Sequence, residues 1–123
     1  MRILVTGATG LLGLNLCLSQ GERHTVIGVT HNVRLNNAPF PLLECDLFSE
    51  NAFSTLLDNQ KIDWVVHCAA MANVDECEKY PQDAHRINAE LPGLIANACA
   101  KMHVDLIHIS TDAVFDGKMG DYS

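Results

Sequence analysis

Three glycines near the start of the chain, Gly7, Gly10 and Gly13, have a spacing that suits the binding of a phosphate group. They follow the apolar run Ile3-Leu4-Val5 and precede a leucine-rich segment, so the pattern predicts a strand, a tight turn and a helix. In such a turn the first glycine permits the bend and the second lets a pyrophosphate approach the backbone. The third glycine lets the helix pack closely on the sheet, and the helix N-terminus points its free amides at the anion.

The spacing G-x-x-G-x-x-G differs from the usual dinucleotide fingerprint G-x-G-x-x-G. A glycine triplet by itself is also consistent with a turn that serves packing alone. Its place between the first predicted strand and the first predicted helix favours the phosphate-binding interpretation.

A second chemical signal lies after the second predicted strand, where the fingerprint expects an acidic residue that binds a ribose 2′-hydroxyl. No Asp or Glu occurs between Glu22 and Glu44, and the strand is followed instead by His31, Asn32 and Arg34. A carboxylate there would repel a 2′-phosphate, whereas neutral or cationic hydrogen-bonding groups would not. The segment therefore favours NADP(H), with NAD(H) as the alternative, although Arg34 is also consistent with a solvated loop arginine.

The elements that would position these residues alternate along the chain. Continuous apolar runs predict strands at 2–7, 24–30, 42–47, 62–70 and 104–110, and apolar periodicity predicts helices at 11–20, 49–60 and about 82–101. Ser49 is the expected N-cap of the second helix, and the segments 73–82 and 111–123 are expected to be irregular. This order predicts one α/β domain over residues 1–123: a Rossmann-like, doubly wound parallel sheet of about five strands with helices on both faces.

Composition narrows the classes of partner. The chain has 123 residues, of which 48% are apolar, and a formal net charge of −7, which argues against nucleic acid as a partner. No run of 18 apolar residues predicts a membrane-spanning helix. The five cysteines form no Cys-x-x-Cys pair and the six histidines have no metal-ligand spacing, so we expect reduced thiols, a cytoplasmic location and no metal site.

Several motifs occur in a specific order: "VTGATGLLG", "CDL", "VVHCAA" and "IHISTDAVFDG". With these motifs the chain resembles the extended short-chain dehydrogenase/reductase family over essentially its whole length. Within that family it is most similar to the dTDP-4-dehydrorhamnose reductase type, particularly across "NVDECEKYPQDAHRINAE" and "STDAVFDG". The resemblance implies hydride transfer from a nicotinamide cofactor to the keto group of a nucleotide-linked sugar.

The resemblance also implies roles for individual positions. It implies that the pyrophosphate is bound by Gly7, Thr9, Gly10, Leu11, Leu12 and Gly13. It implies that other parts of the cofactor contact Asp46, Leu47, Cys68, Ala69, Ala70 and Ser110. Thr111 would hydrogen-bond the substrate carbonyl, and Asn88 would support the active site. From residue type alone, Asp46 is equally a helix-entry residue, Thr111 a turn-capping residue and Asn88 an exposed helix residue.

One departure from the family is large, because the Tyr-x-x-x-Lys pair that supplies the proton is absent. Tyr80 is followed four residues later by Ala84, and Tyr122 is the penultimate residue. We therefore expect the chain to be the N-terminal, cofactor-binding part of an oxidoreductase, inactive by itself and prone to self-association through an incompletely covered sheet.

Two other functions remain open at this stage. One is a non-catalytic NADP-binding regulatory subunit, like that of methionine adenosyltransferase, and the other is a nucleotide-sugar epimerase or dehydratase. Ala113 stands where the reductases usually carry an aromatic residue, so the motif leaves the exact sugar open.

Overall fold

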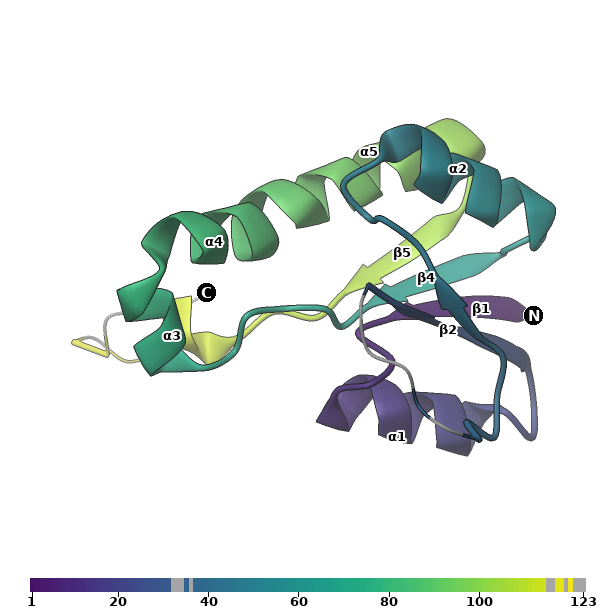
Figure 1. Cartoon of the computed structure of the whole chain (residues 1–123), viewed down its shortest axis with the longest axis horizontal. Helices are drawn as coiled ribbons and strands as arrows, with labels where there is room; N and C mark the ends of the chain where they lie inside the picture. Colours follow the sequence, from purple (N-terminus) through teal and green to yellow (C-terminus); the bar gives the residue numbers. More distant parts are fainter. Residues whose placement is uncertain (32–34, 36, 115–116, 119, 121–123) are drawn as a thin grey trace.

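The computed structural model describes residues 1–31, 35, 37–114, 117–118 and 120. Its centre is a parallel sheet with the strand order β3-β2-β1-β4-β5. The strands are β1 (Arg2–Thr6), β2 (Thr25–Thr30), β3 (Leu42–Glu44), β4 (Trp64–His67) and β5 (Asp105–His108). Helix α1 (Leu11–Gln20) lies on one face, and helices α2 (Glu50–Asn59) and α5 (Leu91–Met102) lie on the other (Figure 1). The predicted Rossmann-like fold class is confirmed.

The central strand β1 explains why this order is stable. Leu4 and Val5 are both fully buried, and they belong to two different apolar clusters. Leu4 is in the cluster that includes Phe53 of α2 and Ile95 of α5, whereas Val5 is in the cluster that includes Cys17 of α1. A strand that is apolar on both faces must be covered on both faces, which is the basis of the doubly wound arrangement.

The helices on the α2–α5 face begin and pack as the sequence suggests. Ser49 is the N-cap of α2, and its side chain accepts a hydrogen bond from the Ala52 N–H at 3.3 Å. Lys101 of α5 forms an ion pair with Glu50 of α2, which links the two helices at the surface. On the opposite face, α1 buries Gly13 and Cys17, and its Leu14 and Leu16 are partly buried against the cluster that includes Val5.

The segment 73–82, expected to be irregular, contains the short helix α3 (Val74–Lys79). The helix expected at about 82–101 is present, and it consists of α4 (Pro81–His85), a π-helical turn, η1 (Arg86–Glu90), and α5. Asn73 caps α3 by accepting a hydrogen bond from the Glu76 N–H, a signal that was present in the sequence. The π turn forms where the Leu91 N–H bonds the Arg86 carbonyl and the next residue, Pro92, has no N–H to donate.

The segment after β5 is also less irregular than expected. A short 3₁₀ turn, η2 (Asp112–Val114), follows the strand. Thr111 precedes this turn, and its Oγ1 accepts a hydrogen bond from the Ala113 N–H at 3.2 Å. A hydroxyl that accepts from the backbone two residues on is a common way to begin such a turn.

Part of the sheet is exposed on the α1 side. Ile107 and Ile109 are 44% and 41% exposed, although Ile107 is in register with Val66, which packs in the cluster beneath α1. Trp64, on the same side of β4, is half-buried. β5 also forms one edge of the sheet, so apolar side chains and free backbone groups are exposed together.

We expect residues 1–123 by themselves to self-associate through this exposed apolar surface of β4 and β5. Sedimentation velocity over a range of concentrations should reveal a species larger than a monomer, and Ile107→Lys should shift the population toward monomer, because burying the added charge is costly. A monodisperse monomer at high concentration would contradict this expectation.

Candidate functional site

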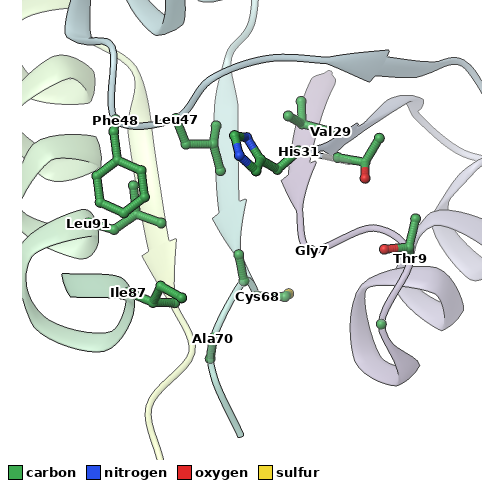
Figure 2. Close-up of a pocket in the computed structure, with 13 residues that line it drawn as sticks. Gly7, Thr9, Val29, His31, Leu47, Phe48, Cys68, Ala70, Ile87 and Leu91 are labelled. Carbon is green, nitrogen blue, oxygen red and sulfur yellow. The ribbon is translucent and has the colours of Figure 1, made fainter. Parts of the chain in front are cut away.

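A cavity of about 400 Å³ opens at the carboxyl ends of β1, β2 and β4 (Figure 2). β2 and β3 lie on one side of β1 in the sheet, and β4 and β5 lie on the other. The strand order therefore reverses at β1, which makes its carboxyl end the topological switch point. Ligands of open α/β sheets bind at such points. The walls are mostly apolar, with the polar side chains of Thr9, Thr30 and His31 placed among them. This composition is typical of a small-molecule or cofactor site.

Many of the residues singled out from the sequence come together here. Those that line the cavity are Gly7, Thr9, Gly10, His31, Leu47, Cys68, Ala69 and Ala70. Those described by the structure that do not line it are Leu11, Leu12, Gly13, Asp46, Asn88, Ser110 and Thr111. Asn32 and Arg34 lie outside the described residues. Gly7, Thr9 and Gly10, which precede α1, thus form one side of the cavity. The residues after β4 form another, where Figure 2 shows Cys68 and Ala70.

The three glycines of the first turn are needed for different structural reasons. Gly7 has a φ of 66°, and a Cβ there would lie 2.7 Å from the Ala69 nitrogen. A Cβ on Gly13 would lie 2.3 Å from the Gly7 carbonyl oxygen. Both positions are therefore closed by the protein itself. At Gly10 the only neighbour of an added Cβ is the Gly7 carbonyl oxygen at 3.3 Å, so this glycine leaves space on the cavity side.

Gly10 is also the N-cap of α1 and provides no side-chain cap for the helix. The first N–H groups of a helix have no partner within the helix and carry its positive dipole end. Leu11 and Leu12 begin this turn, and their side chains are 85% and 50% exposed. Their backbone rather than their side chains would therefore meet an anion, which agrees with the role that the sequence motif implies for them.

A buried polar pair lies directly beneath the cavity. Thr6 Oγ1 lies 2.6 Å from His67 Nδ1 and accepts a hydrogen bond from the Ala69 N–H at 3.3 Å. The side chain of His67 is 1% exposed, its Nε2 has no partner among the described residues, and its ring stacks on that of His108 at 5.2 Å. Burial, and then the neighbouring His108, lowers the pKa of His67 to about 4. The neutral imidazole thus fixes Thr6 and, through it, the wall residue Ala69.

The low pKa of His67 predicts a loss of stability in mild acid. The unfolded chain binds a proton near pH 6.5 and the folded chain only near pH 4, so stability is complete above pH 6.5 and falls as the pH decreases toward 4. We expect the free energy of unfolding to fall by about 2 kcal/mol between pH 7.5 and pH 5. Urea unfolding at these two pH values measures it. His67→Gln should remove most of the difference, whereas the exposed His103→Asn should keep it.

Asn88 acts through the loop after β4 rather than by lining the cavity. Its Oδ1 accepts a hydrogen bond from the Met71 N–H at 2.8 Å, and its Nδ2 donates to the Met71 carbonyl at 3.0 Å. The Cys77 thiol donates to the same carbonyl at 3.2 Å. These bonds fix the backbone next to Ala70, which is a wall residue. Asn88, which lies in the π-helical turn η1, therefore contacts the loop that carries Ala70 and not the cavity itself.

The loop after β3 is fixed by a similar set of contacts. Asp46 Oδ1 accepts a hydrogen bond from the Phe48 N–H at 3.0 Å, the arrangement expected of a helix-entry residue. Leu47 is buried and lines the cavity. The Arg86 guanidinium lies 4.3 Å from the centre of the Phe48 ring, a cation–π contact that holds this wall residue from the helical side.

Five wall residues were missed from the sequence: Val29, Thr30, Phe48, Ile87 and Leu91. Val29 and Thr30 end β2, and the rule that parallel strands bring their carboxyl ends to one edge could have identified them. Ile87 and Leu91 carry no signal beyond apolar periodicity. Only the packing of η1 and α5 against the sheet brings them to the cavity.

The described part of the chain gives little support for a metal site, a membrane-spanning helix or disulfide bonds. No group of three His, Cys, Asp or Glu residues could hold a metal ion there. None of the helices described combines the length and the hydropathy needed to cross a bilayer. The five cysteines carry free thiols, and burial raises the pKa of Cys68, the one cysteine in the cavity wall.

Comparisons with known proteins give consistent matches over nearly the whole chain. The family described as the RmlD substrate binding domain matches residues 1–123. The chain is 39% identical to dTDP-4-dehydrorhamnose reductase of Mycolicibacterium smegmatis, over 93% of this chain and 31% of that protein. It is 33% identical to methionine adenosyltransferase 2 subunit beta of Pongo abelii, over 98% of this chain and 35% of that protein.

Two solved structures extend the comparison. A hypothetical dTDP-4-dehydrorhamnose reductase from Sulfolobus tokodaii superimposes with a TM-score of 0.85 and 36% identity, over 100% of this chain and 44% of that chain. UDP-glucuronic acid 4-epimerase from Bacillus cereus, in complex with UDP-glucuronic acid and NAD, gives a TM-score of 0.81 and 31% identity, with the same coverage. The chain thus spans less than half the length of each of these four proteins.

Proposed function

Since this chain belongs to the RmlD substrate binding domain family, we propose that it is the nicotinamide-dinucleotide-binding part of an oxidoreductase that reduces a nucleotide-linked keto sugar. The observation that carries the proposal is the cavity at the switch point of the sheet, with Gly10 and the start of α1 at one side. The names of the relatives, dTDP-4-dehydrorhamnose reductase among them, support the reaction class.

The residues present fit a dinucleotide. The space beside Gly10, which a Cβ would partly fill, suits a pyrophosphate next to the free amides of α1. The apolar walls formed by Leu47, Phe48, Ile87 and Leu91 suit a planar base. When bound, the dihydronicotinamide would supply a hydride to the substrate's carbonyl carbon.

We propose NADP(H) as the preferred cofactor, with NAD(H) as the alternative. None of the described residues that line the cavity is a carboxylate, and the wall at the end of β2 carries Thr30 and His31. The NAD in the complex of the Bacillus cereus epimerase supports a nicotinamide cofactor without deciding between the two.

On the substrate side, the Thr111 hydroxyl would hydrogen-bond the carbonyl oxygen, which prepares that oxygen to take up negative charge. The alkoxide that forms then needs a proton, and the described residues place no acid beside Thr111 for that purpose. The aspartate next to it, Asp112, is within 3.5 Å of the hydroxyl and is an acceptor when ionised. We therefore assign proton donation to residues outside 1–123 and propose that this chain is inactive alone.

Two alternative functions are each supported by a specific similarity. The likeness to methionine adenosyltransferase 2 subunit beta favours a non-catalytic subunit that retains the cofactor site. The likeness to the Bacillus cereus epimerase favours nucleotide-sugar epimerisation. A Tyr-x-x-x-Lys pair elsewhere in the same polypeptide would support an enzyme, and its absence would support the regulatory subunit. In each case we propose a nucleotide-sugar or nucleotide partner and a cytoplasmic location, which the free thiols support.

The cofactor preference can be tested directly by isothermal titration of the chain with NADP⁺ and NAD⁺ at pH 7.5. We expect one site per chain and a lower Kd for NADP⁺. An equal or lower Kd for NAD⁺ would overturn the preference, and no binding of either would overturn the proposed function.

A further inference from the structure

We propose that His31 makes the choice between NADP and NAD depend on pH, a regulation that rests on the proposed function of the same site. His31 follows Thr30, the last residue of β2, and lines the cavity. In Figure 2 its imidazole extends from the end of β2 into the cavity, on the side where Leu47 also points. This is the strand end at which dinucleotide-binding sheets meet the adenosine ribose.

Histidine is the residue type whose charge changes near neutral pH, and His31 is the one histidine among the described residues of the wall. Among the wall residues it is joined by one other titratable side chain, the Cys68 thiol, whose pKa is raised by burial. A protonated ring carries a positive charge and donates from both nitrogens, which suits a dianionic 2′-phosphate. A neutral ring keeps one donor and one acceptor, which suits a 2′-hydroxyl equally well.

Among the described residues, the elements around His31 bring few other charged side chains to this part of the wall. The glycine turn contributes no charged side chain, and α5 contributes apolar wall residues. From β3, Glu44 is in register with Thr30 and is exposed, and Asp46 is occupied by the Phe48 N–H. From η1, Arg86 is stacked on Phe48. Carboxylates stay ionised and guanidinium stays protonated between pH 6.5 and 8.5, so neither class changes charge in that range.

The electrostatic consequence concerns the 2′-phosphate alone. NADP⁺ and NAD⁺ differ only by that group, so the ratio of their dissociation constants isolates its interaction with the wall. The exposed position of His31 keeps it hydrated, which limits the gain from the charge pair to a modest factor. We expect the ratio Kd(NAD⁺)/Kd(NADP⁺) to rise about threefold to tenfold as the pH falls from 8.5 to 6.5.

The experiment measures both dissociation constants by calorimetry at pH 8.5 and 6.5 for the unmodified chain and two variants. His31→Asn retains a polar side chain but cannot be protonated, and it should hold the ratio within about twofold between the two pH values. His103→Asn is the matched control, since His103 is exposed at the end of α5 in a left-handed conformation that asparagine accepts. It should behave like the unmodified chain. The 2′-phosphate of NADP⁺ also takes up protons as the pH falls. The pH dependence of the ratio measured with His31→Asn gives this contribution, which is subtracted from the pH dependence of the unmodified chain.

Two results would overturn the inference while leaving the proposed function intact. One is a ratio that does not change with pH in the unmodified chain. The other is an equal pH dependence in His31→Asn, which would assign it to another group. If neither dinucleotide binds at either pH, the proposed function fails and this inference fails with it.

Discussion

Residues 1–123 alone should reduce a dTDP-linked 4-keto-6-deoxy sugar at less than about one ten-thousandth of the rate of a complete reductase. In the proposed function Thr111 polarises the carbonyl and the cavity holds the hydride donor, but no described residue is placed to protonate the alkoxide. General acid–base catalysis contributes about 10²–10⁴-fold, and positioning of the substrate contributes more. The measurement is NADPH oxidation at 340 nm, with the Mycolicibacterium smegmatis reductase as the positive control.

A rate near that of the control would contradict the assignment of proton transfer to residues beyond this chain. His67 and Tyr80 would then be the candidates for the acid. His67 is buried and neutral with its pKa near 4, and Tyr80 is 47% exposed at the junction of α3 and α4. Tyr80→Phe abolishing that activity would identify the tyrosine, and His67→Gln abolishing it would identify the histidine.

The substitution Gly10→Val should weaken the binding of NADP⁺ by about 100-fold or more while leaving the fold intact. At Gly10 an added Cβ meets only the Gly7 carbonyl oxygen, at 3.3 Å, so the protein tolerates it with a small adjustment. The branched side chain would instead project on the side of the cavity where a pyrophosphate must approach the backbone. Calorimetric titration measures the affinity, and thermal unfolding confirms that the variant is folded.

Two other glycines serve as controls for this result. Gly93→Ala adds a methyl group on the exposed side of α5, where nothing lies within 4 Å, and should change neither affinity nor fold. Gly13→Ala would place its Cβ 2.3 Å from the Gly7 carbonyl and should destabilise the protein outright. Retention of full affinity by a folded Gly10→Val protein would refute the pyrophosphate site at this turn.

The glycine turn was predictable from sequence because its constraints are local. Gly7 needs a positive φ, and Gly13 must fit against the Gly7 carbonyl, so the spacing itself encodes the contact between strand, turn and helix. The same holds for the strand ends, where continuous apolar runs predict the parallel sheet and small residues such as Ala69 follow β4. These features account for most of the wall nearest to β1.

The far wall of the cavity could not be predicted in the same way. Phe48, Ile87 and Leu91 reach it through contacts between segments about 40 residues apart in the sequence, and apolar periodicity does not specify which partner a helix meets. The π-helical turn illustrates the point, because apolar periodicity predicts one continuous helix at about 82–101 and does not show that Asn88 contacts Met71. Asn73 is a residue type that commonly caps helices, but the polar residues after it show no apolar periodicity that would predict a helix there.

The central claim, that this cavity binds a nicotinamide dinucleotide, is tested most directly by ¹⁵N–¹H NMR of the chain titrated with NADP⁺. The account predicts saturable shifts of the backbone amides of Gly10, Leu47 and Ala69, with the amide of Gly93 on the outer side of α5 unchanged. The absence of shifts at millimolar NADP⁺, or shifts confined to residues away from the carboxyl ends of the strands, would contradict it.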